Sequence, residues 1–99
     1  MCYRIEYSKE AIEHLRELEA RQRNLIFDAV DKQLAYEPTV ETLNRKLMRP
    51  NVLSVYELRV QNLRVYFDVE KSPEKVVVIR AIGRKQGNKV YIAGEEITL

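Results

Sequence analysis

Residues 56–69 read Tyr-Glu-Leu-Arg-Val-Gln-Asn-Leu-Arg-Val-Tyr-Phe-Asp-Val, and this stretch decides the fold of the chain. Apolar and polar side chains alternate on both sides of Gln61-Asn62, with the period of two that half-buried strands show. A two-residue loop of this kind joins antiparallel strands. The stretch therefore predicts a β-hairpin with strands over residues 56–60 and 63–69.

The register of this hairpin has a chemical consequence. If Gln61-Asn62 form the turn, the apolar residues pair on the core face, and Arg59 stands directly opposite Arg64 on the other face. Two guanidinium groups repel unless solvent screens them, whereas a phosphate between them makes the pair favourable. The sequence leaves both interpretations open.

The hairpin is followed by a third strand with a basic ending. A turn at residues 71–74 leads into the apolar run 75–82, which predicts a buried strand that completes an antiparallel meander. We expect this strand to stop at Gly83 and open into a loop that presents Arg84, Lys85 and Lys89, with Tyr91 just beyond. Whether Arg80 shares a face with Arg59 depends on the turn at 71–74, which the sequence does not fix.

The first half of the chain predicts one strand and two helices. Residues 3–7 alternate as a strand, and Ser8 suits the N-cap of a helix. Two apolar stripes follow at helical spacing before Pro38 ends the helical region. One unbroken helix over residues 9–36 would be about 40 Å long, too long for a domain of this size, so we expect a break near Arg21 and an antiparallel helix pair. A loop is expected over residues 37–53.

These elements describe a single α+β domain that spans residues 1–99. Their order is strand, helix, helix, then three strands, and we expect the helices to pack on one face of a small antiparallel sheet. With 99 residues, the chain has room for one hydrophobic core.

Charge is distributed unevenly along the chain. Residues 1–44 carry six Lys/Arg against nine Asp/Glu, whereas residues 45–89 carry eleven against four. Gathered on one surface, the positive charge of the second segment would attract phosphate groups; scattered, it would only aid solubility.

Several classes of function find no support in the sequence. No stretch approaches the roughly 20 apolar residues that cross a bilayer, and the first residues do not resemble a signal peptide, so we expect a cytoplasmic protein without membrane contact. A single cysteine, Cys2, and a single histidine, His14, exclude a Cys/His zinc site. We expect neither a metal nor a cofactor.

The segment Tyr-Glu-Leu-Arg-Val-Gln-Asn-Leu-Arg-Val-Tyr at 56–66, the ending Ile-Gly-Arg-Lys at 82–85 and Val-Tyr at 90–91 resemble the RelE/ParE superfamily of bacterial type II toxins. Members of the RelE branch cut messenger RNA on the ribosome without a metal, and members of the ParE branch poison DNA gyrase. Both are held inactive by a cognate antitoxin. The resemblance implies a toxin whose partners are an antitoxin and either the ribosome with mRNA or gyrase.

Carried over to this chain, the resemblance assigns a catalytic role to Arg64, Lys85 and Tyr91, with the adjacent Arg84 as an alternative occupant of the position of Lys85. Two lysines of the best-known RelE pattern fall at Val55 and Glu57, so one cation is missing and one has become an acid. RNA cleavage by a ribose 2′-hydroxyl needs a base, an acid and cations for the phosphate oxygens. Candidates for the base are Glu57 and Tyr91, and Lys85 is the candidate acid. The residues expected to bind phosphate are Arg59, Arg80, Arg84 and Lys89.

Three readings of the function remain. The chain is a ribosome-dependent mRNA endonuclease, a ParE-like inhibitor of gyrase that acts by protein binding, or an inactive module that binds antitoxin or RNA. The missing lysines favour the second reading, and the arginine pair with its basic neighbours favours the first.

Overall fold

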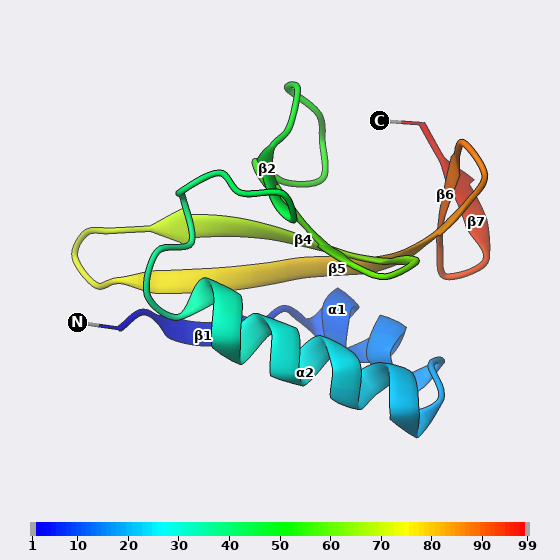
Figure 1. Ribbon diagram of the computed structural model, residues 1–99, viewed down its shortest axis with the longest axis horizontal. Helices are drawn as coiled ribbons and strands as arrows, with labels where there is room; N and C mark the ends of the chain where they lie inside the picture. Colours follow the sequence, from blue (N-terminus) through cyan, green and yellow to red (C-terminus); the bar gives the residue numbers. More distant parts are fainter. Residues whose placement is uncertain (1, 99) are drawn as a thin grey trace.

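The computed structural model describes residues 2–98, which contain seven strands and two helices (Figure 1). The first half holds β1 (Arg4–Tyr7), α1 (Lys9–Arg16), α2 (Ala20–Leu34) and β2 (Arg45–Leu47). The second half holds β3 (Tyr56–Val60), β4 (Leu63–Glu70), β5 (Val76–Gln86), β6 (Lys89–Ile92) and β7 (Glu95–Ile97). The predicted α+β class is confirmed.

The strands form one sheet in the order β2-β3-β4-β5-β6-β7, and each neighbour in that order is antiparallel. The predicted meander of β3, β4 and β5 is therefore confirmed. Strand β1 lies parallel to the first half of β5, on the edge that β6 uses farther along. Strands β2, β6 and β7 extend the sheet beyond the four strands that the sequence indicates.

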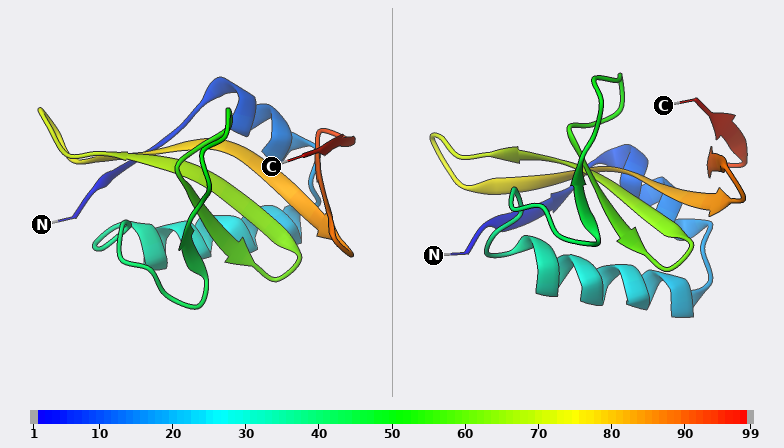
Figure 2. Two further views of the ribbon diagram at one scale, coloured as in Figure 1. Left: turned by 90° about the horizontal axis from the view of Figure 1, so that it is seen from above. Right: turned by 45° about the horizontal axis from the view of Figure 1, so that its top comes forward.

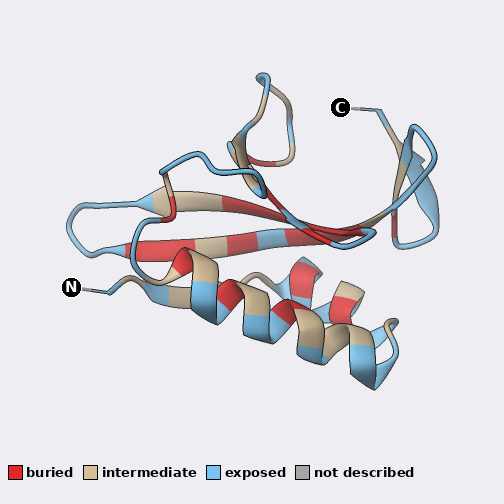
Figure 3. Ribbon diagram, in the orientation of Figure 1, coloured by how far each residue is buried: buried red, intermediate tan, exposed pale blue. Residues whose placement is uncertain are grey.

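The helices cover one face of the sheet (Figures 1 and 2). Buried residues of both helices, such as Leu15 and Ile26, share one core cluster with the inward residues of β3, β4 and β5. Figure 3 shows these buried positions along the central strands and on the inner sides of the helices. The prediction that the helices pack on one sheet face is confirmed. None of the described helices is long and apolar enough to span a membrane.

The break between the helices lies earlier than predicted. The predicted break into two helices is confirmed: α1 ends at Arg16 and α2 begins at Ala20, so the break lies a few residues before Arg21. Here the guanidinium of Arg23 donates to the carbonyl oxygens of Leu15 and Leu18, which stabilises the turn in place of a glycine or proline. At the start of α1, Ser8 is the N-cap as predicted, and its hydroxyl accepts the amide of Ala11 at 3.1 Å.

Side chains of α1 fill a gap in the edge of β5. Strand β1 pairs with β5 up to Ile79, and β6 takes over only at Arg84. Between these points the hydroxyl of Ser8 donates to the carbonyl of Arg80 at 3.0 Å, and the Ile82 amide donates to Nδ1 of His14 at 3.2 Å. These contacts satisfy backbone groups that would otherwise remain unpaired.

A β-bulge in β5 decides which face each later residue occupies. Tyr66 pairs with Ala81 and Phe67 pairs with Ile79, so Arg80 is left without a partner on β4. Because the bulge adds one residue to β5, each later residue lies on the face opposite to the one that simple alternation along the strand would predict. After the bulge, Ile82 still reaches the core under the helices, whereas Ala81 belongs to a second cluster on the opposite face.

The strand does not stop at Gly83 as predicted. It continues to Gln86, turns at Gly87-Asn88 and returns as β6. The basic segment is therefore a hairpin arm and not a loop. Glycine suits this strand position because the space above it is occupied: a Cβ there would lie 3.1 Å from Cε2 of Tyr66.

Candidate functional site

An open cavity of about 350 Å³ lies on the sheet face opposite the helices, and we call it the open-face cavity. Its floor comes from β3, β4 and the end of β5, and its walls come from Met48 and the β6–β7 hairpin. The charged residues that line it are Glu57, Arg59, Arg64, Lys85, Lys89 and Glu96. Five of the eight predicted site residues therefore meet in one place.

The predicted pairing of two arginines is confirmed, since Arg59 stands opposite Arg64 in the register of β3 and β4. Arg64 is only 7% exposed, and its Nη1 donates to the carbonyl oxygens of Gln61 and Leu63 at 2.7 and 2.8 Å. Within residues 2–98 its guanidinium forms no ion pair with a carboxylate. A buried and rigidly held cation without a counter-ion favours an anionic ligand.

Glu57 supplies a carboxylate among these cations. Its side chain is 15% exposed, and Oε1 lies 3.4 Å from Nε of Arg59, which is 46% exposed. This is a loose ion pair, because the arginine is largely in solvent. On the edge of β3 away from β4, Lys46 of β2 pairs with Glu57. Sequence reasoning missed Lys46, since a strand of three residues within residues 37–53 carries too little alternation to be recognised.

The β5–β6 hairpin contributes two lysines. Lys85 reaches the open-face cavity because the bulge has exchanged the two faces of β5. Its backbone amide donates to the carbonyl of Asn62 at 2.7 Å, which fixes the arm beside the β3–β4 turn. Lys89 also lines the cavity, and its Nζ lies 3.7 Å from the carboxylate of Glu96.

Arg84 and Tyr91 do not join this group. They line a second cavity of about 300 Å³ on the helix side of the β5–β6 hairpin, together with His14, Glu17 and Gln86, and we call it the helix-side cavity. Tyr91 pairs with Arg84 across the hairpin. Because side chains of consecutive residues leave a strand on opposite faces, Arg84 points away from the cavity that Lys85 enters.

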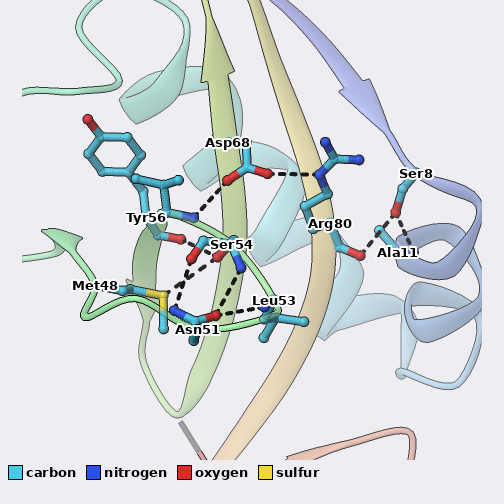
Figure 4. A network of polar contacts seen from close by, with 10 residues as sticks. Ser8, Ala11, Met48, Asn51, Leu53, Ser54, Tyr56, Asp68 and Arg80 are labelled. Carbon is cyan, nitrogen blue, oxygen red and sulfur yellow. Dashed lines mark hydrogen bonds and ion pairs between the residues drawn. The ribbon is translucent and has the colours of Figure 1, made fainter.

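Arg80 has a structural contact elsewhere. Its Nε donates to Oδ2 of Asp68 at 2.9 Å, and Oδ1 of Asp68 accepts the amide of Val55 at 2.7 Å (Figure 4). The same loop is held by Asn51, whose side chain donates to the carbonyl of Ser54 and accepts the amide of Leu53. Arg80 therefore anchors the segment before β3, outside the open-face cavity.

The open-face cavity gathers groups that bind anions. It combines a buried arginine, a partly exposed arginine, two lysines and the two carboxylates of Glu57 and Glu96. Among the described residues, no three His, Cys, Asp or Glu side chains are grouped so as to hold a metal ion. A scan of the chain against protein-family models found no match, and a search of curated proteins found none either.

Proposed function

We propose that this protein binds RNA through the open-face cavity and cleaves it without a metal, as the toxin of a type II toxin-antitoxin pair. The observation that carries the proposal is the pairing of Arg59 with the buried, counter-ion-free Arg64 in a cavity that also holds Lys85 and Glu57. A phosphate between the two guanidiniums would relieve their repulsion and accept hydrogen bonds from both.

Each residue then has a chemical role. Arg64 is rigid and always charged, so it suits stabilisation of the negative charge that develops on the phosphate oxygens. Glu57 accepts the proton of the attacking 2′-hydroxyl, and the ammonium group of Lys85 donates a proton to the departing 5′-oxygen. Of the two candidate bases, Glu57 is favoured over Tyr91 because it shares the cavity with the arginines.

The test is cleavage of messenger RNA in a purified translation reaction. Glu57→Gln keeps the shape of the side chain and removes its basicity, so we expect the cleavage rate to fall by about 100-fold or more while RNA binding is retained. Tyr91→Phe is the matched control, and its rate should stay within about twofold of the unmodified protein. Full activity of Glu57→Gln, or no cleavage by the unmodified protein, would contradict the proposal.

A second candidate is inhibition of gyrase by protein binding, as in the ParE branch. It is favoured by Val55 and Glu57 at the two positions where the RelE pattern has lysines, and by the placement of Tyr91 in the helix-side cavity. A supercoiling assay with purified gyrase separates the two: the nuclease proposal predicts no inhibition there. DNA breaks that depend on this protein would favour the second candidate.

For the antitoxin we propose the groove between the helices. It is lined by Tyr7, Ile12, Leu15 and Phe27 with Arg16 and Arg23 at its rim, and Ile12 and Phe27 are 43% and 38% exposed. An amphipathic helix with acidic residues beside its apolar face would fit this surface. Phe27→Asp should abolish capture of a cognate antitoxin and leave RNA cleavage intact. Unchanged capture would exclude the groove.

A further inference from the structure

Tyr66 lies directly beside Glu57 and has a buried hydroxyl without a partner. The two residues are paired in the register of β3 and β4, so both side chains rise from the same face of the sheet. Tyr66 is 0% exposed, and its hydroxyl makes no hydrogen bond to any described residue. A buried hydroxyl that stays unpaired costs free energy, so this group needs an explanation.

The charged side chains near the hydroxyl include one carboxylate that can accept its proton. The cluster around Tyr66 is apolar; its members are Ala81, Ile92, Met48, Leu53, Val90 and Ile97. The charged groups that act on the phenol are Glu57 and Arg64. A guanidinium can only donate, and Nη1 of Arg64 already serves two carbonyl oxygens. The carboxylate of Glu57 is therefore the group that can accept the phenol proton.

The ring is closely packed in this position. Gly83 lies against it, and a Cβ at that residue would be 3.1 Å from Cε2 of Tyr66, 3.1 Å from Val90 and 3.2 Å from Ile92. Tyr66 is not among the residues that line the open-face cavity. Its neighbour Glu57 does line the cavity, so the hydroxyl can act on the reaction through Glu57.

We propose that Tyr66 is a positioning residue that donates a hydrogen bond to one carboxylate oxygen of Glu57 and leaves the other oxygen facing the cavity as the proton acceptor. This deepens the proposed function and rests on it. The remaining ionisable groups that face Glu57 are Arg59 on its own strand, Lys46 on β2, Arg64 on β4, Lys85 on β5, Lys89 on β6 and Glu96 on β7.

The phenol is suited to donate throughout the neutral range. Burial raises the pKa of Tyr66 well above its usual value, and the negative charge of Glu57 raises it further. The group therefore remains protonated when Glu57 is ionised, which a donor to a carboxylate requires.

The test uses Tyr66→Phe, which keeps the ring and removes the hydroxyl. We expect kcat to fall about tenfold with KM within about twofold, because substrate binding is left intact. Tyr56→Phe is the matched control, because Tyr56 stacks on Phe67 and packs against the core under the helices.

A measurement without RNA separates this proposal from the proposed function. In carbon NMR spectra of the free protein at neutral pH, the side-chain carboxyl signal of Glu57 should shift in Tyr66→Phe and stay fixed in Tyr56→Phe. An unchanged signal overturns the proposal whether or not the protein cleaves RNA. A shifted signal in a protein that never cleaves RNA overturns the function and keeps the contact.

A readout on the unmodified chain covers the case in which Tyr66→Phe does not fold. The hydroxyl proton of Tyr66 should exchange slowly with water and show a through-space NMR signal to the side chain of Glu57. Exchange as fast as that of an exposed phenol would overturn the proposal.

Discussion

The two cavities on either side of the β5–β6 hairpin differ in how they collect their charged residues. The open-face cavity takes Arg59, Arg64 and Lys85 from three neighbouring strands, whereas the helix-side cavity takes Arg84 and Tyr91. Arg84 and Lys85 are adjacent in the chain and still belong to different cavities. Proximity in sequence therefore does not assign a residue to a site on a sheet; the face it occupies does.

The largest expected effect is on RNA binding. Arg64→Gln removes a fixed cation from the open-face cavity, and we expect the affinity for a short single-stranded RNA to fall about 10- to 100-fold. Arg84→Gln makes the same chemical change in the helix-side cavity, and it should alter the affinity by less than about twofold. Fluorescence anisotropy at one salt concentration measures both. Equal losses would show that the two cavities act as one.

The packing around Gly83, which forms the wall between the cavities, should be sensitive to the size of the side chain at this position. Gly83→Val places carbon atoms where Tyr66, Val90 and Ile92 already lie, and such overpacking costs about 1–3 kcal/mol. The thermal midpoint should fall by about 4–8 °C for each kcal/mol, as measured by circular dichroism. A valine variant as stable as the unmodified protein would mean that the wall is not tightly packed.

Loss of the His14 contact should have a smaller effect. His14→Leu removes the acceptor of the Ile82 amide, which we expect to cost about 1 kcal/mol of folding free energy. Hydrogen exchange of that amide should quicken, whereas Glu13→Gln, an exposed change on the same helix, should leave it unaltered. Unchanged exchange in His14→Leu would show that the contact does not protect the strand.

On the helix side, alkaline pH should produce the mildest of these effects. Burial, helped by the charge of Asp31, raises the pKa of Tyr7 from 10.0 to about 12. The unfolded chain therefore loses this proton first, so stability is complete below pH 10 and declines as pH rises toward 12. Tyr7→Phe should flatten that decline in urea unfolding measured at several pH values. An identical decline in both proteins would assign it to other groups.

The features that depend on local pattern could be predicted from the sequence. Alternation around Gln61-Asn62 fixed the register that sets Arg59 opposite Arg64, and Ser8 marked the start of α1. The position of the helix break could not be predicted, because the side chain of Arg23 stabilises the turn from a distance in sequence.

The residues of the site could be predicted only where the alternation of a strand shows which face each side chain occupies. Glu57, Arg59 and Arg64 lie on a hairpin whose faces can be counted from its turn. Lys46 lies on a strand too short to show a period, and Tyr91 lies beyond a bulge that no residue type announces. A bulge depends on how two strands fit each other, so it cannot be predicted from the sequence of one strand alone.

The unpaired Arg80 sets the phase of the last third of the chain. Removing one residue between Ile79 and Gly83 would remove the bulge and leave a regular ladder, so Lys85 would stay in the open-face cavity and Arg84 and Tyr91 would stay on the helix side. Removing two would exchange the faces, because no extra residue would be left to compensate for the second loss. Chains that keep this arrangement can therefore lose the bulge residue, whereas the loss of one more would exchange the contents of the two cavities at once.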